Sequence, residues 1–174
     1  MRLTMETQRL ILRPFNKNDA EDMFHAWAND PEVTKYLTWN PHESVETSKM
    51  IIAQWVEQYK KPERLIFAIA LKENGKLIGC IDVVGYLDGT PVIGYVLSRA
   101  HWGRGYMTEA CRTLLTLLFA IGHNEVRIDA QVENIGSNRV IQKCGGQFLR
   151  AEEDARPLKN DIVMVNRYIV RRPL

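Results

Sequence analysis

A change of hydrophobic period in the middle of the chain limits the folds that this sequence can adopt. Val92 to Ser98 is rich in β-branched and aliphatic residues, as expected of a strand. After a break that contains two glycines, apolar residues recur at helical spacing, namely Met107, Cys111, Leu114, Leu115, Leu118 and Ile121. The sequence therefore predicts a strand, a tight turn and a long helix in direct succession, with the helix ending near Gly122.

The segments on either side predict a sheet with helices between its strands. Lys72-Glu73-Asn74-Gly75 separates two strand-like runs and is a strong hairpin-turn signal. In chain order, the expected elements are a strand at 8–14, helices at 16–29 and 44–59, strands at 65–71, 76–86 and 92–98, a helix at 107–121, a strand at 126–132, a short helix at 134–143 and strands at 147–151 and 162–170. This order predicts the α+β class, with a mixed, mainly antiparallel central sheet, flanking helices and one domain over residues 1–174.

Composition excludes several classes of protein. A chain of 174 residues with 25% charged residues can bury one sizeable core. A net charge of +2 lacks the basic excess of a nucleic-acid binder, and no zinc spacing or other metal ligand set is present, so we expect neither nucleic acid nor metal. Cys80, Cys111 and Cys144 lie in apolar stretches without C-x-x-C spacing and are expected to be reduced structural thiols. No apolar leader or membrane span is visible, so a cytoplasmic protein is expected.

The break between the central strand and helix has the chemistry of an anion site. Gly103 and Gly105 permit a tight turn, which leaves the backbone N–H groups of about residues 103–108 free at the positive end of the helix dipole. Such a cradle suits a pyrophosphate. A nucleotide P-loop would need G-x-x-x-x-G-K-[ST], and a dinucleotide fingerprint would need a glycine in place of Thr108. The alternative is a plain surface turn before a helix.

Several ordered motifs resemble the GNAT superfamily of N-acetyltransferases, and especially its ribosomal-protein N-terminal acetyltransferase branch. The resemblance covers nearly the whole chain. Its marks are Thr7-Gln8-Arg9-Leu10-Ile11-Leu12-Arg13-Pro14, Asn29-Asp30-Pro31-Glu32-Val33, Ile93-Gly94-Tyr95-Val96-Leu97, Trp102-Gly103-Arg104-Gly105-Tyr106-Met107-Thr108-Glu109-Ala110, Asn134 with Ser137, and Lys143 with Gly145. The resemblance implies a GNAT-like fold with acetyl-CoA as the cofactor and a primary amine as the acceptor.

The resemblance also implies roles for matching residues. The backbone of Tyr95, Val96 and Leu97 should bond the pantetheine arm, with the N–H of Leu97 facing the acetyl carbonyl. The pyrophosphate should be held by Trp102, Gly103, Arg104, Gly105, Tyr106, Met107 and Thr108. Asn134 and Ser137 should approach the pantetheine and the thioester sulfur, although an Asn with a Ser three residues later is also a plain helix N-cap.

The chain departs from the family pattern at several positions. Trp102 stands where many members have Gln or Arg, and Met107 where many have a small residue. Ile141 replaces the tyrosine often used as general acid, which leaves Ser137 as the nearby hydroxyl for protonating the leaving thiolate. Pro91 and Val92 stand where a glutamate is common, so the usual general base is missing.

The missing base favours an acceptor that is easily deprotonated. An α-amino group with a pKa near 8 is roughly one-tenth neutral at pH 7, whereas deprotonating a lysine costs about 4.6 kcal/mol. We therefore expect a peptide or protein N-terminus as acceptor, with Asp82 as the candidate base; the alternative for Asp82 is an exposed strand carboxylate. Glu109 is assigned to helix-end electrostatics or a tie to a neighbouring loop, and His101 to the surface or the cofactor edge.

Other readings of the sequence remain open. Trp39 is placed near the acceptor, while Trp27, Tyr36 and Trp55 are expected mostly in the core. The acceptor could instead be a small amine, such as a polyamine, an amino acid or an antibiotic. The absent tyrosine and glutamate also fit a non-catalytic acyl-CoA sensor. A monomer and a homodimer are both compatible with the sequence.

Overall fold

One mixed sheet organises the chain. The computed structural model describes residues 3–61 and 64–173; residues 1–2, 62–63 and 174 of the expected domain lie outside this description. Within the described residues, eight strands form a sheet in the order β1-β2-β3-β4-β5-β6-β8-β7. The strands are β1 Met5–Glu6, β2 Leu10–Arg13, β3 Ile66–Leu71, β4 Leu77–Leu87, β5 Thr90–Leu97, β6 Glu125–Gln131, β7 Gln147–Arg156 and β8 Asp161–Arg171. Neighbouring strands are antiparallel except β5 and β6, which are parallel, so the predicted α+β class is confirmed.

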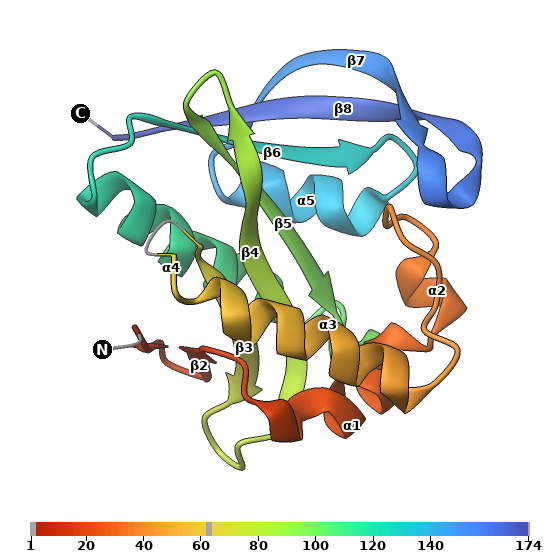
Figure 1. The fold of residues 1–174 in the computed structure, drawn as a ribbon. Coiled ribbons are helices and arrows are strands. Elements are labelled where there is room, and N and C mark those ends of the chain that lie inside the picture. Colours follow the sequence, from red (N-terminus) through yellow and green to blue (C-terminus); the bar gives the residue numbers. More distant parts are fainter. Residues whose placement is uncertain (1–2, 62–63, 174) are drawn as a thin grey trace.

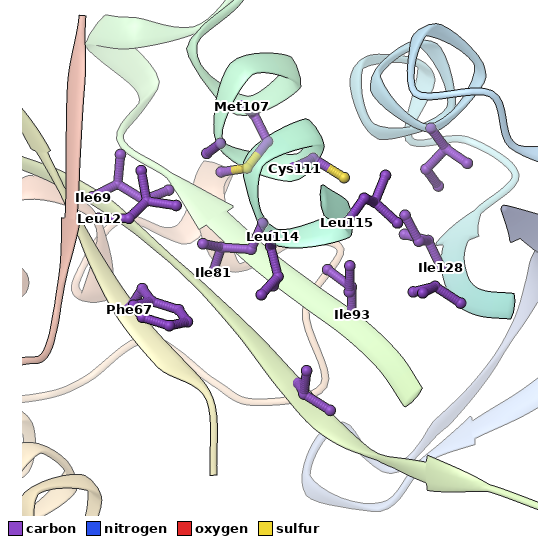
Figure 2. Close-up of a cluster of buried hydrophobic side chains, with 14 of the residues drawn as sticks. Leu12, Phe67, Ile69, Ile81, Ile93, Met107, Cys111, Leu114, Leu115 and Ile128 are labelled. Carbon is purple, nitrogen blue, oxygen red and sulfur yellow. The ribbon is translucent and has the colours of Figure 1, made fainter. Parts of the chain in front are cut away.

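Helices cover both faces of this sheet. The short helices α1 (Ala20–Met23) and α2 (Pro31–Thr34) and the longer α3 (Val45–Gln58) lie on one side, whereas α4 (Tyr106–Ala120) and α5 (Ile135–Lys143) lie on the other (Figure 1). Each side has its own apolar core. Figure 2 shows Met107, Cys111, Leu114 and Leu115 of α4 directed at the strands. Trp27, with no exposed surface, belongs to the second core beneath α3.

The sheet opens in its middle, between β5 and β6. These two strands pair only at Val92 with Arg127 and at Ile93 with Ile128. Residues 94–97 of β5 continue beside β4 but have no partner in β6, and the two strands diverge in Figure 1. The end of the strand predicted at 92–98 therefore borders a gap in the sheet, and the helix predicted at 107–121 follows from there.

The first part of the chain differs in detail from the prediction. The helix expected over 16–29 is present as one continuous helical run capped by Asn16, but its type changes: a 3-10 turn at Lys17–Asp19 leads into α1, and a π-helical turn follows at Phe24–Ala28, before α2. Asp30 caps α2 by accepting from the Glu32 N–H, so the Asn-Asp-Pro signal starts a helix as well as ending one. Strand β1, at two residues, is too short for a period-two pattern.

The last hairpin is longer than predicted. Strand β7 runs to Arg156, five residues beyond the expected end at residue 151, although Glu152 and Asp154 are charged. Both carboxylates bind Arg167 of β8 across the ladder, at 2.8 and 2.9 Å, so the strand keeps its pairing.

Among the described residues, no helix combines the length and the apolar character that crossing a bilayer requires.

Candidate active site

The turn between β5 and α4 has the backbone geometry of an anion cradle. Gly103 and Gly105 both have left-handed φ angles, 73° and 80°, which a residue with a Cβ adopts only with strain. Gly105 is the N-cap of α4, and no side chain caps this helix. The N–H groups of the first turn therefore have no intrahelical acceptor and are available at the positive end of the dipole.

The side chains in and beside this turn differ in exposure and in their contacts. Trp102 is nearly half exposed, and its Nε1 donates to the carbonyl oxygen of Leu97 at 2.8 Å. Met107 is buried in the core, so it can offer a ligand only its backbone. His101, expected at the surface or the cofactor edge, is instead buried and lies 3.0 Å from the Ser98 hydroxyl. Burial lowers the pKa of His101, and the charges of Lys76 and Arg104 add to this shift.

The backbone of β5 presents alternate residues to the gap. The Ser98 N–H donates to the Ile78 carbonyl of β4 at 2.8 Å. Because hydrogen-bonded and non-hydrogen-bonded pairs alternate in an antiparallel ladder, Val96, which pairs with Cys80, also bonds to β4. Tyr95 then directs its N–H and C=O toward the gap, and Leu97 its N–H, whereas the Leu97 C=O already accepts from Trp102 Nε1. The predicted backbone set of three residues thus offers free polar groups at two of them.

Helix α5 places a hydroxyl pair beside the gap. Asn134 is its N-cap, and the side-chain oxygen accepts from the Ser137 N–H at 3.1 Å, so the plain capping interpretation is correct for this side chain. The Ser137 hydroxyl lies 2.8 Å from the hydroxyl of Tyr95. The Tyr95 hydroxyl also donates to the Ser137 carbonyl at 3.3 Å. Burial raises the pKa of Tyr95, so it remains a protonated donor at neutral pH.

A cleft of about 710 Å³ passes through the opening in the sheet. Asp82, Tyr95, Val96, Asn134 and Ser137 all line it, whereas Leu97 and residues 102–108 do not. Asp82 and Ser137 reach the cleft from opposite faces of the sheet. Asp82 pairs with Gly94 and shares its face, while Tyr95 points to the face of α4 and α5, where its hydroxyl meets Ser137.

Asp82 is the carboxyl of the cleft whose pKa is shifted into the neutral range. Burial raises its pKa to about 7, against a smaller lowering by the charge of Arg64. Gly94 keeps the space beside this carboxyl open, because a Cβ at residue 94 would lie 2.6 Å from Val84 Cγ1 and 3.5 Å from Asp82 Oδ1. A carboxyl that exchanges a proton near pH 7 is suited to general base catalysis. The structure thus places Asp82 in a partly buried cleft position instead of on an exposed strand.

The far wall of the cleft is aromatic and is held by the last hairpin. Trp27, Tyr36, Trp39 and Trp55 all line the cleft, so the aromatic segment contributes more than Trp39 to this site. Arg156, buried at the end of β7, donates to the carbonyls of Lys35 at 2.8 Å and Leu37 at 3.2 Å. This contact fixes the loop after α2 against the hairpin.

The Tyr95 side chain is part of the site, although the sequence analysis assigned a role only to its backbone. Ile141, at the position where the family resemblance led us to look for a tyrosine acting as general acid, is fully buried in the core. The Tyr95 hydroxyl, from the strand instead of the helix, lies beside Ser137 in its place. The period of β5 contained the signal, because Ile93, Tyr95 and Leu97 must share one face, and that face turns toward α5.

The site fits a coenzyme A thioester. Free N–H and C=O groups along the gap suit the amides of a pantetheine arm, and the uncapped helix start suits a diphosphate. This combination defines an acyl-coenzyme A-dependent acyltransferase. The acetyltransferase (GNAT) domain family matches residues 9–147, and the chain belongs to this family. It is therefore an N-acetyltransferase, and its cofactor is acetyl-CoA.

Known relatives extend over nearly the whole chain. The uncharacterized N-acetyltransferase p20 of Bacillus licheniformis is 30% identical over 167 residues, which cover 92% of this chain and 93% of that protein. The fold is similar to that of RimL, a ribosomal L7/L12 alpha-N-protein acetyltransferase solved with coenzyme A, with TM-score 0.85, 18% identity and coverage of 97% and 98%. It is also similar to the microcin C7 self immunity acetyltransferase MccE, solved with acetyl-CoA and AMP, with TM-score 0.83, 22% identity and coverage of 95% and 94%.

Proposed function

We propose that this enzyme acetylates the α-amino group at the N-terminus of a peptide or protein. The observation that carries this proposal is Asp82, a carboxyl with a pKa of about 7 in the cleft. An α-amino group with a pKa near 8 differs from this base by about one unit, whereas a lysine differs by more than three. Proton transfer from an α-ammonium to Asp82 is therefore only slightly uphill. The α-amine activity of RimL, a protein of the same fold, supports this choice.

Each group of the site has a distinct role in this proposal. Bound acetyl-CoA supplies the acetyl thioester. Asp82 takes a proton from the acceptor amine on its side of the sheet, directly or through water. The Leu97 N–H donates to the thioester carbonyl oxygen, and the N–H groups of residues 103–108 bind the diphosphate. Ser137 supplies a proton to the departing sulfur while Tyr95, at 2.8 Å, passes its own proton to Ser137; Asp82 releases the amine proton to water, and a proton from water returns to Tyr95.

The charges in the cleft give less support to a polycationic acceptor. Asp129 and Asp154 line the cleft beside Asp82, which at first suits a polyamine. Both carboxylates, however, bind the guanidinium of Arg167, at 2.8 and 2.9 Å. Arg156 lines the same wall and is itself paired with Asp161. A single amine with a neutral, extended chain behind it fits these charges better than a polyamine does.

The test is free-thiol release from acetyl-CoA with a panel of acceptors. The panel contains a peptide with a free N-terminus, the same peptide with its N-terminus formylated and an internal lysine retained, spermidine and free amino acids. We expect turnover with the free peptide alone, and a loss of about 10²-fold in kcat for Ser137→Ala. Turnover on spermidine or on the lysine would contradict the α-amine proposal. Tight binding of acetyl-CoA without turnover on any acceptor would indicate a sensor.

A further inference from the structure

Arg9, in the segment that leads into β2, makes four contacts with the start of α4. Its Nη1 donates to the carbonyl of Arg104 at 2.9 Å, and its Nε donates to Glu109 Oε2 at 2.7 Å. Its backbone N–H donates to Glu109 Oε1 at 2.9 Å. The guanidinium also lies over the ring of Tyr106, with Cζ 4.5 Å from the ring centroid. Arg9, about a hundred positions earlier in the chain, thus binds both the turn, at Arg104, and the first turn of α4, at Glu109.

The contact with Arg104 fixes the direction of a neighbouring N–H group. In a trans peptide the C=O of one residue and the N–H of the next point in opposite directions. Arg9 holds the Arg104 carbonyl toward β2, so the Gly105 N–H of the same peptide is directed away from Arg9. Because Gly103 and Gly105 lack side chains, little else in the turn restricts its peptide planes. Arg9 therefore restricts the conformational freedom of this peptide before an anion binds, so that binding does not have to.

Arg9 also controls the one acidic side chain in the first turn of α4. Glu109 would repel an anion at the helix start, because its carboxylate lies within the same turn. The Thr7 hydroxyl, at 2.6 Å, and Arg9 engage both of its oxygens and hold the carboxylate on the β2 side. Burial by itself would raise the pKa of Glu109, but these hydrogen bonds and the Arg9 charge lower it overall. Glu109 is thus ionised and neutralised by Arg9.

We propose that Arg9 is a positioning residue for the coenzyme A diphosphate: it presets the N–H groups of the turn and neutralises Glu109 beside them. The inference rests on the proposed role of residues 103–108 in binding the diphosphate, and it is independent of the acceptor. It also gives a physical reason why a segment near the N-terminus contributes to the cofactor site, although it lines neither the cleft nor the gap.

The experiment compares two ligands of different length. Coenzyme A contains the diphosphate, whereas S-acetylpantetheine ends before it. We expect Arg9→Ala to weaken coenzyme A binding by about tenfold in titration calorimetry, because preorganisation is lost, and to leave the Kd for S-acetylpantetheine unchanged. Lys72→Ala is the matched control, since Lys72 pairs with Glu6 at 2.7 Å and reaches the Thr7 carbonyl at 3.5 Å, while its side chain contacts neither Glu109 nor residues 103–108. Lys72→Ala should change neither ligand.

A second substitution separates positioning from folding. If the Glu109 charge contributes to the loss, Glu109→Gln in the Arg9→Ala background should recover part of the coenzyme A affinity, which a loss of folding would not allow. Gly105→Val tests the turn itself, because a β-branched residue cannot adopt its φ angle without strain. If Gly105→Val weakens coenzyme A binding and Arg9→Ala does not, the inference about Arg9 is wrong and the turn assignment stands. If neither affects binding, both are wrong.

Discussion

At the scale of the residue, the pH dependence of the proposed reaction depends on the ionisation of Asp82. Its pKa of about 7 means that the carboxyl is half ionised at neutral pH and becomes a competent base as the pH rises. With a peptide acceptor, kcat/KM should therefore increase with pH through two ionisations, near 7 for Asp82 and near 8 for the α-amine. Asp82→Asn should lower kcat by about 10²-fold and remove the ionisation near 7. A pH–rate profile of both proteins tests this.

The control for that profile is Asp88→Asn, which alters an exposed carboxylate in the turn between β4 and β5. Asn also tolerates the positive φ of residue 88, so the backbone should not be strained. An Asp82→Asn enzyme that kept the ionisation near 7 would show that another group accepts the proton.

Asp82→Asn should also make the protein more stable. Because the folded-state pKa of Asp82 is about 7 and its ordinary value is 3.8, the folded protein retains a proton that the unfolded chain has released between these pH values. The free energy of unfolding therefore falls as the pH rises through this window. Asp82→Asn removes that penalty and should stabilise the protein by about 2 kcal/mol at pH 8, after allowance for partial exposure. Urea denaturation at pH 8 and pH 4.5 should show the gain at the higher pH only.

At the scale of the element, α5 is oriented by one buried amide. The Asn138 side-chain oxygen accepts from the Tyr168 hydroxyl at 2.7 Å and from Asn166 Nδ2 at 2.9 Å. Its Nδ2 donates to the carbonyls of Gln131 and Asn134, at 2.9 and 2.8 Å. All four hydrogen-bonding positions of this amide are thus used, which joins α5 to β6 and β8 one residue from Ser137.

Replacing Asn138 should therefore affect both stability and catalysis. Asn138→Ala leaves the buried Tyr168 hydroxyl without its acceptor and removes the amide donor to Gln131 and Asn134, whose carbonyls keep their backbone donors, so it should cost about 2–3 kcal/mol in urea denaturation. Tyr168→Phe removes one donor and should cost only about 1 kcal/mol. Asn138→Ala should also lower kcat because Ser137 loses its fixed position. Equal costs for the two variants would show that the amide network is not what holds α5.

Predictions from the sequence succeeded where a repeating pattern encoded the element. The helix predicted over 107–121 and the hairpin at 72–75 depend on local period and turn chemistry, and both are present as α4 and the β3–β4 connection. The helical segment at 16–29 was predicted with the right bounds, but its change from 3-10 to α to π geometry is not encoded in its period. The Tyr95–Ser137 contact, and the ties from Arg9 and Arg156, are long-range contacts between elements, which period and composition do not encode.

At the scale of the whole molecule, the gap between β5 and β6 divides the sheet, and side chains of the last hairpin connect its two sides near the proposed acceptor wall. Lys159 and Asn40 join the tip of the last hairpin to the loop after α2, with Lys159 Nζ 2.6 Å from the Thr34 carbonyl and Asn40 Nδ2 2.8 Å from the Leu158 carbonyl. Arg156 is the buried member of this set and lines the cleft. The shape of the acceptor wall therefore depends on Arg156.

Arg156→Met should separate acceptor binding from cofactor binding. The substitution retains much of the side-chain volume but removes the donors to Lys35 and Leu37 and the partner of Asp161. We expect KM for a peptide acceptor to rise by about tenfold, while the Kd for coenzyme A stays the same, because the diphosphate turn lies on the other side of the sheet. Arg171→Met, at the far end of β8, removes an ion pair with Glu125 and should change neither constant. If Arg156→Met instead weakened coenzyme A binding as strongly as it raised KM, the two sides of the gap would be mechanically coupled, and the acceptor wall could not be treated as a separate unit.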